Sequence, residues 1–365
     1  MNRVIGTIVW VVLLTTSLAS DASENAAWMS SNWGIRVVLP AGNNSFTNQF
    51  DPAILVQQLA TLKTPKWVMV NATQGGDGGY FTIPINKLTQ HIDKSIAPPR
   101  NLLGEAVKLL RDNGFRVIVY FAADGPAGRN RKNVSKSMHQ TKQILKRQAI
   151  TQAWERLLKV DKLTNEDAVS KYILEPIAAS FGTDIDGWWF DHGKWGNANK
   201  YISSVRKGNP AAAIAWNEKH GVVICNSPLD KQNYSVWIPK ISNNFEDYTA
   251  GHITPTRRMS PWNKCNESAI NEIEKMSMHS VSNIKGLLPH WFVPIQRGWR
   301  RGEANFPIKQ LLNWTTRILK SGGAITWAVA LEQPEFTNSE LGKEQYRQLK
   351  ILDEYLLNEG LTLPR

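Results

Sequence analysis

Strand-like runs alternate with helix-like periods along nearly the whole chain of 365 residues. The expected strands are short apolar runs bounded by polar or turn-forming residues, and they lie at residues 33–40, 66–71, 115–122, 186–191, 212–216 or 221–226, near 243–248, 287–294 and 324–329. Helical periods lie between them, at residues 52–62, 101–114, 137–181, 267–276 and 308–323. Continuous apolar strands separated by helices indicate a parallel sheet covered on both faces.

This alternation predicts an α/β fold. About eight strand–helix units favour a single TIM-like (β/α)8 barrel over an open doubly wound sheet. The doubly wound alternative is further disfavoured because no Gly-x-Gly-x-x-Gly fingerprint follows the first strand. No linker-like composition divides the chain, so we expect one domain over residues 21–365.

The first twenty residues, MNRVIGTIVWVVLLTTSLAS, have the pattern of a secretory signal peptide. Arg3 is followed by an apolar stretch that is short for a membrane span, and then by small residues. We therefore expect cleavage near residues 19–20 and a secreted or periplasmic protein, with an uncleaved anchor as the alternative. No later segment approaches eighteen consecutive apolar residues, so we expect no membrane partner after removal of the signal.

The chain is basic, with 43 Lys and Arg residues against 31 Asp and Glu residues and a formal charge of +12. A basic exported protein favours an anionic partner: nucleic acid, lipid headgroups or an acidic polysaccharide. Nucleic acid is disfavoured because the sequence has no nucleic-acid-binding module and carries a signal peptide. Basic residues concentrate at 128–147, 254–260 and 296–303, each after an expected strand, so they share one rim of the predicted barrel.

Functional residues of a (β/α)8 barrel gather at the carboxyl ends of its strands, where we expect three carboxylates: Asp191, Glu246 and Asp247. Two carboxylates facing one sugar perform glycoside cleavage, one at the anomeric carbon and one protonating the leaving oxygen. A separation of about 5 to 5.5 Å leads to retention of configuration, and a wider one to inversion. Capping of the next helix is the structural alternative for each carboxylate.

Fifteen tryptophans are a heavy load for this chain, and several lie near expected strand ends. Sugars stack their flat C–H faces on aromatic rings, whereas core packing is the alternative role. Trp188 and Trp189 are adjacent on one strand, so their side chains point to opposite faces and one is expected in the core. The predicted substrate-binding residues are Asp77, Tyr120, His192, Trp195, Asn226, His252, His290, Trp291, Arg297, Trp299, Arg300 and Trp327.

Other catalytic chemistries lack their sequence patterns. No cluster of His and Glu has helical metal-ligand spacing and no Gly-x-Ser-x-Gly elbow is present, so we expect no metal site, no cofactor and no serine-hydrolase triad. Cys225 and Cys265 are the only cysteines and fit no zinc motif. They form either one disulfide or two buried thiols.

The run DGWWFDHGKW, residues 186–195, resembles the fourth-strand motif of the α-L-fucosidase clan, glycoside hydrolase family 29 and its relatives. The resemblance implies that Asp191 is the nucleophile. Three further stretches are similar to this clan in the same order: 101–125 to its third-strand unit, 221–228 to its fifth strand, and 309–329 to its last helix and eighth strand. The likeness covers most of residues 33–330 and implies the same barrel.

The chain departs from family 29 at two motifs. A sugar-binding His-His-Asp-Gly is replaced by Gly75-Gly76-Asp77-Gly78, in which only the Asp and the last Gly match. The motif that ends in the family's acid/base glutamate aligns with Thr249-Ala250-Gly251, so that glutamate is missing. We also expect no counterpart of the β-sandwich that is usual in exo-acting fucosidases. The candidates for the acid/base are Glu246 as first choice, then Asp247, His252 and His290.

A remodelled pocket with a basic rim looks like the endo-acting fucanases of glycoside hydrolase families 107 and 168, which cut sulfated fucans. The resemblance implies a retaining endo-α-L-fucanase in which Asp191 attacks the sugar and Glu246 acts first as acid and then as base. Arg297, Arg300 and Arg301 are expected to hold sulfates, because guanidinium forks match sulfate oxygens in pairs. An exo-α-L-fucosidase and a non-catalytic carbohydrate-binding barrel are the alternatives.

Overall fold

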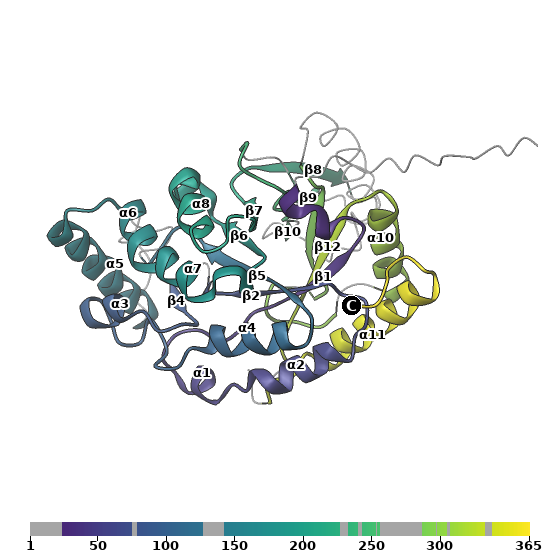
Figure 1. Cartoon of the computed structure of the whole chain (residues 1–365), viewed down its shortest axis with the longest axis horizontal. Helices are drawn as coiled ribbons and strands as arrows, with labels where there is room; N and C mark the ends of the chain where they lie inside the picture. The colour runs from purple at the N-terminus through teal and green to yellow at the C-terminus, as the bar shows by residue number, and fades with distance from the viewer. Residues whose placement is uncertain are drawn as a thin grey trace, which may run out of the picture.

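The computed structural model describes residues 24–74, 79–126, 142–226, 233–239, 243–252, 254–255, 287–296, 298–304, 307–332 and 338–365. A curled sheet of seven parallel strands lies at its centre (Figure 1). These strands are β1 (Trp33–Val37), β2 (Trp67–Asn71), β5 (Arg116–Ala122), β6 (Gly187–Asp191), β7 (Ala213–Trp216), β11 (His290–Pro294) and β12 (Ala324–Val329). Their order is β11-β12-β1-β2-β5-β6-β7, and every neighbouring pair is parallel. The predicted α/β class is confirmed.

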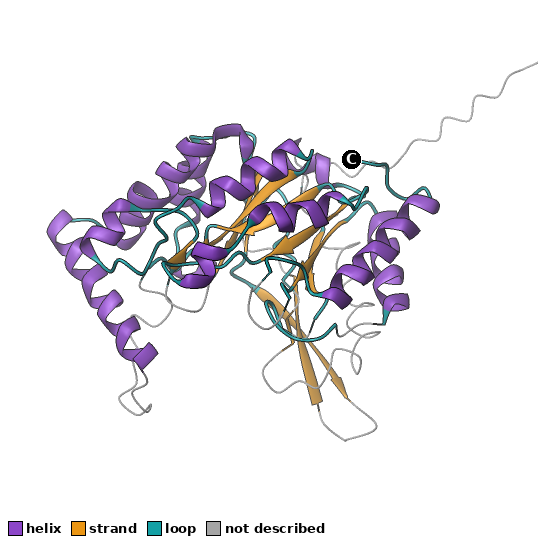
Figure 2. Ribbon diagram, turned by 90° about the horizontal axis from the view of Figure 1, so that it is seen from below, coloured by secondary structure: helices purple, strands orange, loops and turns teal. Residues whose placement is uncertain are grey.

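Helices surround the outer face of this sheet (Figures 1 and 2). They are α1 (Ser45–Gln49), α2 (Pro52–Ala60), α3 (Asn86–His91), α4 (Leu102–Asp112), α5 (Lys142–Asp161), α6 (Asn165–Val169), α7 (Glu175–Phe181), α8 (Ala198–Arg206), α10 (Ile308–Lys320) and α11 (Lys343–Asn358), with the π-helical turn η2 (Ser170–Leu174) and the 3-10 turns η1 (Glu24–Met29), η3 (Gly182–Asp184) and η4 (Gly193–Trp195). Periodicity predicts α2, α4 and α10 closely, whereas the expected helix at 137–181 is divided into α5, α6 and α7. The expected helix at 267–276 lies outside the described residues.

Helix α4 shows how the sequence sets both ends of a helix. Its buried face consists of Leu102, Leu103, Ala106, Val107 and Leu110. Asn101 caps its start, because the side-chain oxygen accepts a 2.8 Å hydrogen bond from the N–H of Gly104. Gly114 follows its end with φ of +79°, a left-handed conformation that is accessible to glycine at little cost.

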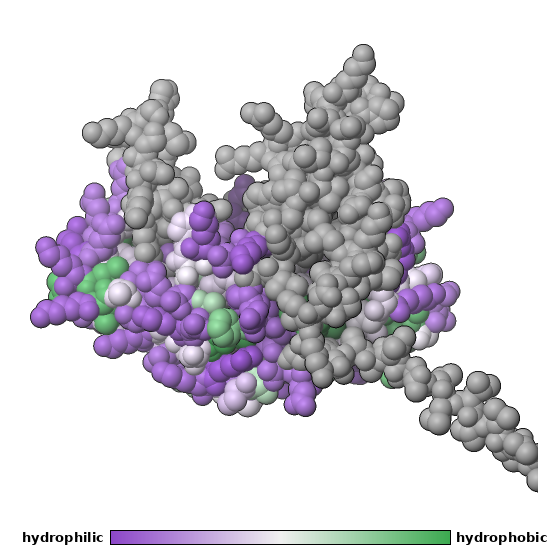
Figure 3. Space-filling model, turned by 90° about the horizontal axis from the view of Figure 1, so that it is seen from above, coloured by the Kyte–Doolittle hydropathy of each residue, from purple (hydrophilic) through white to green (hydrophobic). Residues whose placement is uncertain are grey.

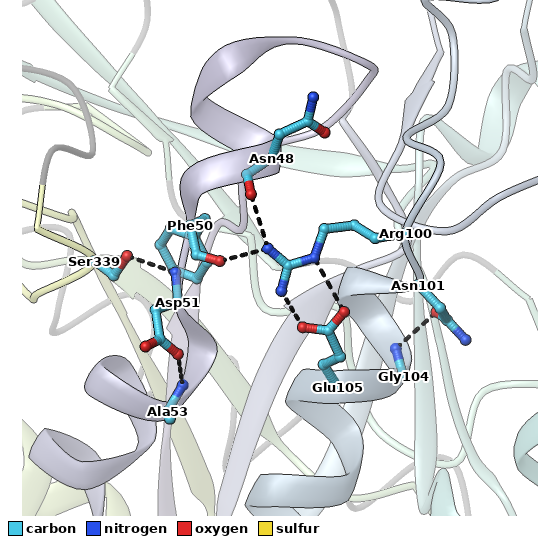
Figure 4. A network of polar contacts seen from close by, with 9 residues as sticks. All are labelled: Asn48, Phe50, Asp51, Ala53, Arg100, Asn101, Gly104, Glu105 and Ser339. Carbon is cyan, nitrogen blue, oxygen red and sulfur yellow. Dashed lines mark hydrogen bonds and ion pairs between the residues drawn. The ribbon is translucent and has the colours of Figure 1, made fainter.

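A network of polar contacts ties the start of α4 to the connection between α1 and α2 (Figure 4). Arg100 pairs with Glu105 of α4, and its Nη1 donates to the carbonyl of Phe50 at 2.8 Å. The next residue, Asp51, donates its N–H to the hydroxyl of Ser339 at 2.8 Å. One arginine therefore fixes segments that lie about fifty residues apart in the sequence.

The segment 247–252 lies between the two edges of the parallel sheet. The N–H of Asp247 donates to the carbonyl of Ile214 in β7 at 2.8 Å, and the N–H of Phe292 in β11 donates to the segment at 2.8 Å. Isolated parallel bridges also join the segment to Leu288 and Phe292. The strand expected near 243–248 is therefore displaced along the chain, since residues 243–246 form a turn.

Gly251 permits close packing of this segment against β11. Its φ is +65°, in the left-handed region that favours glycine. A Cβ atom at this position would lie 2.3 Å from the carbonyl oxygen of His290. Position 251, where the sequence resemblance implies the counterpart of the acid/base glutamate, therefore has no room for a side chain.

The two faces of the sheet carry separate hydrophobic cores. The larger core lies between the sheet and the helices and includes Trp188, and the smaller one lies on the inner face. Trp189 belongs to the inner core, which confirms that the adjacent tryptophans point to opposite faces. Ala26 and Met29 of η1 pack against this inner core as well. The inner core consists of Ala26, Met29, Trp67, Met69, Ile118, Tyr120, Ala122, Trp189, Ala213, Ala215, Tyr248, Ala250, Leu288, Phe292, Ala324 and Ala328.

A second, antiparallel sheet projects away from the parallel one (Figure 2). Its strands are β8 (His220–Asn226), β9 (Asn233–Pro239) and β10 (Thr254–Pro255), and a small two-stranded sheet pairs β3 (Thr73–Gln74) with β4 (Tyr80–Phe81). Both alternatives for the fifth strand therefore form strands. Residues 213–216 join the parallel sheet, and residues 220–226 enter the antiparallel one.

The described residues that are visible on one side of the molecule are mostly hydrophilic, with small hydrophobic patches between them (Figure 3). Large exposed apolar side chains among the described residues include Phe46, Val160, Trp195, Phe245 and Leu363. Within the described ranges, no helix combines the length and the apolarity that crossing a membrane requires. The expected signal peptide, residues 1–20, lies outside them.

Candidate active site

Strand β6 ends in a carboxylate that is surrounded by hydrogen-bond donors. Oδ2 of Asp191 accepts from the hydroxyl of Tyr120 in β5 at 2.6 Å. Oδ1 accepts from the side-chain amide of Asn217, which follows β7, at 2.7 Å, and from the backbone N–H of His192 at 2.8 Å. Nε2 of His192 lies 3.3 Å from Oδ2. Because β5, β6 and β7 are parallel neighbours, their carboxyl ends bring these groups to one edge of the sheet.

This setting keeps Asp191 ionised. Burial is the largest single influence, and by itself it raises the pKa of the carboxyl group. The charges of His192 and His252 oppose burial, as do the hydrogen bonds from Tyr120 and Asn217. Their combined effect holds the pKa of Asp191 well below its usual range. Burial, with the Asp191 charge second, raises the pKa of the Tyr120 hydroxyl well above its ordinary value, so this group remains a donor.

His192 is fixed between two carboxylates. Its backbone is left-handed, with φ of +57°, which is uncommon for a residue other than glycine and typical of functional sites. Nδ1 lies 3.0 Å from Oδ2 of Asp124, which is 3 % exposed, while Nε2 faces Asp191. The ring therefore cannot rotate without breaking contacts on both sides.

Four stacked rings form a row on the inner side of the sheet. The Tyr120 and Trp189 ring centroids are 5.4 Å apart with planes at 16°, and those of Trp189 and His252 are 5.9 Å apart at 28°. His252 in turn stacks on Trp299, with centroids 4.6 Å apart and planes at 24°. Phe292 lies against the same row, with its ring centroid 4.7 Å from that of Trp299. The row begins at Tyr120, which donates to Asp191, and ends at Trp299 in the loop after β11. It holds His252 between the indoles of Trp189 and Trp299.

The two carboxylates predicted beside Asp191 lie at the amino end of the segment 247–252. Glu246 accepts from the backbone N–H of Trp216 at 3.2 Å and from that of Asn243 at 3.1 Å. Asp247 forms an ion pair with Arg206 at 2.8 Å. The oxygens of both carboxylates therefore bind neighbouring backbone or side-chain groups. His252 lies at the other, carboxyl end of the segment.

Three other predicted residues occupy buried positions. His290, the first residue of β11, is 1 % exposed, and its ring nitrogens lie 3.0 Å from the Thr249 carbonyl and 2.8 Å from Oγ1 of Thr326. Burial lowers the pKa of His290 to about 3, so its ring is neutral near pH 7. Trp291 and Trp327 belong to the core between the sheet and the helices. These two indoles pack in the protein interior and not at the strand-end edge where we expected them.

The remaining predicted residues lie on the rim or outside the described part of the chain. Trp195 is 40 % exposed, and its ring centroid lies 6.3 Å from that of His192. Arg300 is half-buried and Arg301 is exposed. Asp77, Arg297 and Cys265 lie outside the described residues, as do the side chains of Asn226 and Cys225. Among the residues that are described, no group of His, Cys, Asp and Glu is arranged to hold a metal ion.

Three residues of the site are missed by sequence reasoning. Asn217 carries the same signal as Asn226, a polar residue after an apolar run, but it belongs to the alternative strand. Asp124 follows β5 by two residues, at a strand end where functional side chains are expected in this fold class. Arg36 lies within the apolar run of β1, and it is 6 % exposed with Nη1 donating to the carbonyl of Trp299 at 3.1 Å. Its inward position depends on the register of the sheet, which no local pattern reports.

The chain is similar to known carbohydrate-active enzymes. Residues 23–359 match the family model described as Endo-alpha(1,4)-fucoidanase Mef1, and no curated protein sequence matches the chain. A solved endo-fucoidan hydrolase of glycoside hydrolase family 107 has a TM-score of 0.76 and 18 % identity, covering 94 % of this chain and 96 % of that one. Another from family 107 has a TM-score of 0.71 and 18 % identity, covering 93 % and 55 %. A family 29 α-L-fucosidase from Bacteroides thetaiotaomicron has a TM-score of 0.53 and 14 % identity, covering 94 % and 75 %. At these identities the structural likeness shows a shared fold.

Proposed function

We propose that this chain, which belongs to the Mef1 family of endo-α(1,4)-fucoidanases, cleaves α-L-fucosidic bonds within sulfated fucan and retains the configuration of the sugar. Family membership makes the chain a glycoside hydrolase. The observation that carries the finer proposal is the ionised carboxylate of Asp191, held by Tyr120, Asn217 and His192 at the carboxyl end of β6. A carboxylate at this position in a parallel sheet is suited to attack on a sugar carbon.

We also propose that the sheet closes as a (β/α)8 barrel within one domain over residues 21–365. The segment 247–252 supports this proposal, because it forms hydrogen bonds with β7 on one side and with β11 on the other. It would act as the eighth strand of the barrel, between the edge strands β7 and β11. Its carboxyl end then brings His252 to the same rim as Asp191.

The proposed reaction has two steps. An oxygen of Asp191 attacks the anomeric carbon while the bond to the leaving sugar breaks, and the acid gives its proton to the leaving oxygen. The same acid/base then removes a proton from water, whose oxygen attacks the anomeric carbon and releases Asp191 as a carboxylate. A low pKa suits Asp191 to this role, because it is a nucleophile in the first step and a leaving group in the second. The 2.6 Å hydrogen bond from Tyr120 is the shortest of the donor contacts and holds Oδ2, while Oδ1 accepts from Asn217 and from the backbone of His192.

Two side chains compete for the acid/base role. Glu246 remains the prediction from the sequence, although its two oxygens accept the backbone N–H groups of Trp216, the last residue of β7, and of Asn243. His252 is the second candidate, and three observations favour it. It lies at the carboxyl end of that segment, its ring is stacked between Trp189 and Trp299, and its charge acts on Asp191. Imidazole is the most frequent general acid and base in enzymes.

The charge of the molecule supports a sulfated substrate. The chain carries a formal charge of +12, and Arg300 and Arg301 lie on the loop that also carries Trp299. Guanidinium groups bind sulfate oxygens, while indoles stack on sugar faces. We propose that this loop contacts the polymer next to the bond that is cut. Because such polymers are too large to enter a cell, we further propose that the protein is secreted or periplasmic.

The test compares wild type with Asp191→Asn on purified sulfated fucan, with the size of the products followed by gel filtration. Wild type should cut internal bonds, so the average size of the polymer should fall early in the reaction. Asp191→Asn should be at least about 1,000-fold less active than wild type. Asp112→Asn is the matched control, since this exposed carboxylate pairs with Lys108 on the surface of α4, and this variant should stay fully active. Equal activity of Asp191→Asn and wild type would reject Asp191 as nucleophile. Binding without cleavage by wild type would favour a carbohydrate-binding barrel, and faster turnover of a small aryl fucoside would favour an exo-fucosidase.

A further inference from the structure

We propose that Arg36 is a positioning residue that joins the two ends of the stacked ring row and orients Asp191 through Tyr120. The inference rests on the proposed function, in which Asp191 is the nucleophile. Arg36 would not touch the substrate. It would act through the tyrosine that donates to the nucleophile and through the loop that carries Trp299.

The register of β1 places Arg36 on the inner face. Arg36 pairs with Ala328 of β12 on one side and with Met69 of β2 on the other, and both partners belong to the inner core. Its neighbours Ile35 and Val37 belong to the core on the helix side. The arginine side chain therefore extends into the space enclosed by the curled sheet, where it is 6 % exposed.

Arg36 contacts ring faces and a carbonyl. Its guanidinium carbon lies 5.3 Å from the ring centroid of Tyr120 and 5.7 Å from that of Phe292, which is within the range of cation–π attraction. Nη1 donates to the carbonyl of Trp299 at 3.1 Å. Among the described residues, Nε has no hydrogen-bond partner. The contacts that hold the guanidinium are therefore two ring faces and one backbone oxygen.

These contacts link Arg36 to both arms of the candidate site: the first consists of Tyr120 and Asp191, and the second of Trp299 and His252. On one arm, Arg36 lies against the ring of Tyr120, whose hydroxyl donates to Asp191 at 2.6 Å. On the other arm, it holds the backbone of Trp299, whose ring stacks on His252. Loss of the guanidinium would release both arms at once. A shift of about 1 Å in a reacting group costs about 100-fold in rate.

Electrostatics strengthen the geometric argument. Burial is the largest influence on Arg36 and lowers its pKa to about 10, so the side chain stays charged at neutral pH. Tyr120 and Asp191 act in the opposite direction, while the nearby charge of Arg300 adds to the lowering. Because the interaction is mutual, the charge of Arg36 also favours the ionised form of Asp191. The titratable groups that act directly on Asp191 are His192, His252 and Tyr120. Arg36 interacts with Asp191 through its charge, Arg300 acts on Arg36, and Asp124 acts on Tyr120 and pairs with His192.

The experiment measures kcat, KM and the pH profile of kcat/KM on sulfated fucan for Arg36→Met and Arg36→Lys. Arg36→Met should lower kcat about 10- to 100-fold with KM within about twofold, because the substrate does not touch this residue. Its acidic limb should move to higher pH, since removing a positive charge raises the pKa of Asp191. Arg36→Lys keeps the charge, so its acidic limb should match that of wild type while kcat recovers only in part, since an ammonium lacks the planar fork.

Arg111→Met is the matched control for the loss of a partly buried arginine. Arg111 pairs with Asp186, the residue directly before β6, at the opposite end of the strands. This variant should lose stability while its pH profile stays that of wild type. If Arg36→Met does not fold, Arg36→Lys decides, and a kcat equal to that of wild type would overturn the inference. A folded Arg36→Met with unchanged kcat and acidic limb would overturn it as well. Activity that survives in Asp191→Asn would instead reject the proposed function, so the two failures are distinguishable.

Discussion

The hydroxyl of Tyr120 donates a 2.6 Å hydrogen bond to Oδ2 of Asp191, across the pair of parallel strands β5 and β6. A donor at this distance stabilises the carboxylate form more than the neutral acid. In the proposed reaction, the same donor remains near the oxygen when the carboxylate becomes an ester. Tyr120 would therefore both orient the proposed nucleophile and favour its ionised form.

Tyr120→Phe should lower kcat about 10- to 100-fold, since a hydrogen bond to a charged group contributes about 1.5 to 3 kcal/mol. The ring remains and still stacks on Trp189, so the thermal midpoint should change little. The acidic limb of kcat/KM should move to higher pH, because the loss of a donor raises the pKa of Asp191. Steady-state kinetics from pH 7 down to the lowest pH at which both proteins stay folded, together with thermal melting, measure these effects. Unchanged kinetics would show that the hydrogen bond has no part in the reaction.

His252→Gln and Glu246→Gln separate the two candidates for the acid/base. The true acid/base variant should lose about 100- to 10,000-fold on sulfated fucan. It should lose far less on an aryl glycoside of a sulfated fuco-oligosaccharide, whose leaving group needs no proton, and azide should restore its turnover. We expect this behaviour from His252→Gln. Glu246→Gln should instead lower stability, because its oxygens hold the N–H groups of Trp216 and Asn243. Azide rescue of Glu246→Gln alone would reverse the assignment.

Protonation of His290 should contribute to acid destabilisation. Burial lowers its pKa to about 3 in the folded state, against about 6.5 in the unfolded chain. Between these values the unfolded state binds more protons, so the free energy of unfolding falls as the pH falls below about 6.5. The contribution between pH 7 and pH 5 is about 2 kcal/mol. Urea unfolding at both pH values should show a smaller pH dependence for His290→Gln than for wild type. An identical dependence in the two proteins would show that His290 is not buried in its neutral form.

Gly251→Ala should destabilise the protein by at least about 2 kcal/mol, because it adds both backbone strain and a clash with the His290 carbonyl. Gly322→Ala is the matched control. Its φ is +81°, but a Cβ there would meet nothing within 4 Å, so only the strain of about 1 kcal/mol applies. Urea unfolding measures both variants. Equal losses would mean that the segment 247–252 does not pack tightly against β11.

Local sequence patterns predict much of this fold, because a continuous apolar run identifies a buried strand from residues that are adjacent in the sequence. The runs at 33–40, 66–71, 115–122 and 324–329 all contain strands of the parallel sheet. The fifth strand was left open between two runs, since both have strand-forming residues and only tertiary pairing separates them. The prediction of Asn226, in place of Asn217, as a site residue results from this ambiguity.

The site depends more strongly on long-range register. Asp191 and Tyr120 are predictable because they lie at or near the ends of apolar strands. Arg36 is not, since an arginine inside an apolar run is equally compatible with either face until the sheet is assembled. Trp291 and Trp327 carry the same kind of uncertainty, and the alternation along β11 and β12 sends them to the helix side.

The most direct test of the central claim is to trap the intermediate on Asp191. A 2-deoxy-2-fluoro-fucosyl donor with an activated leaving group, extended as a sulfated oligosaccharide, should slow the second step more than the first. Mass spectrometry of the digested protein should then find the sugar attached to the peptide that contains Asp191, and proton NMR should show that the first product retains its α configuration. A β-configured first product, or an adduct on any other residue, would contradict the account.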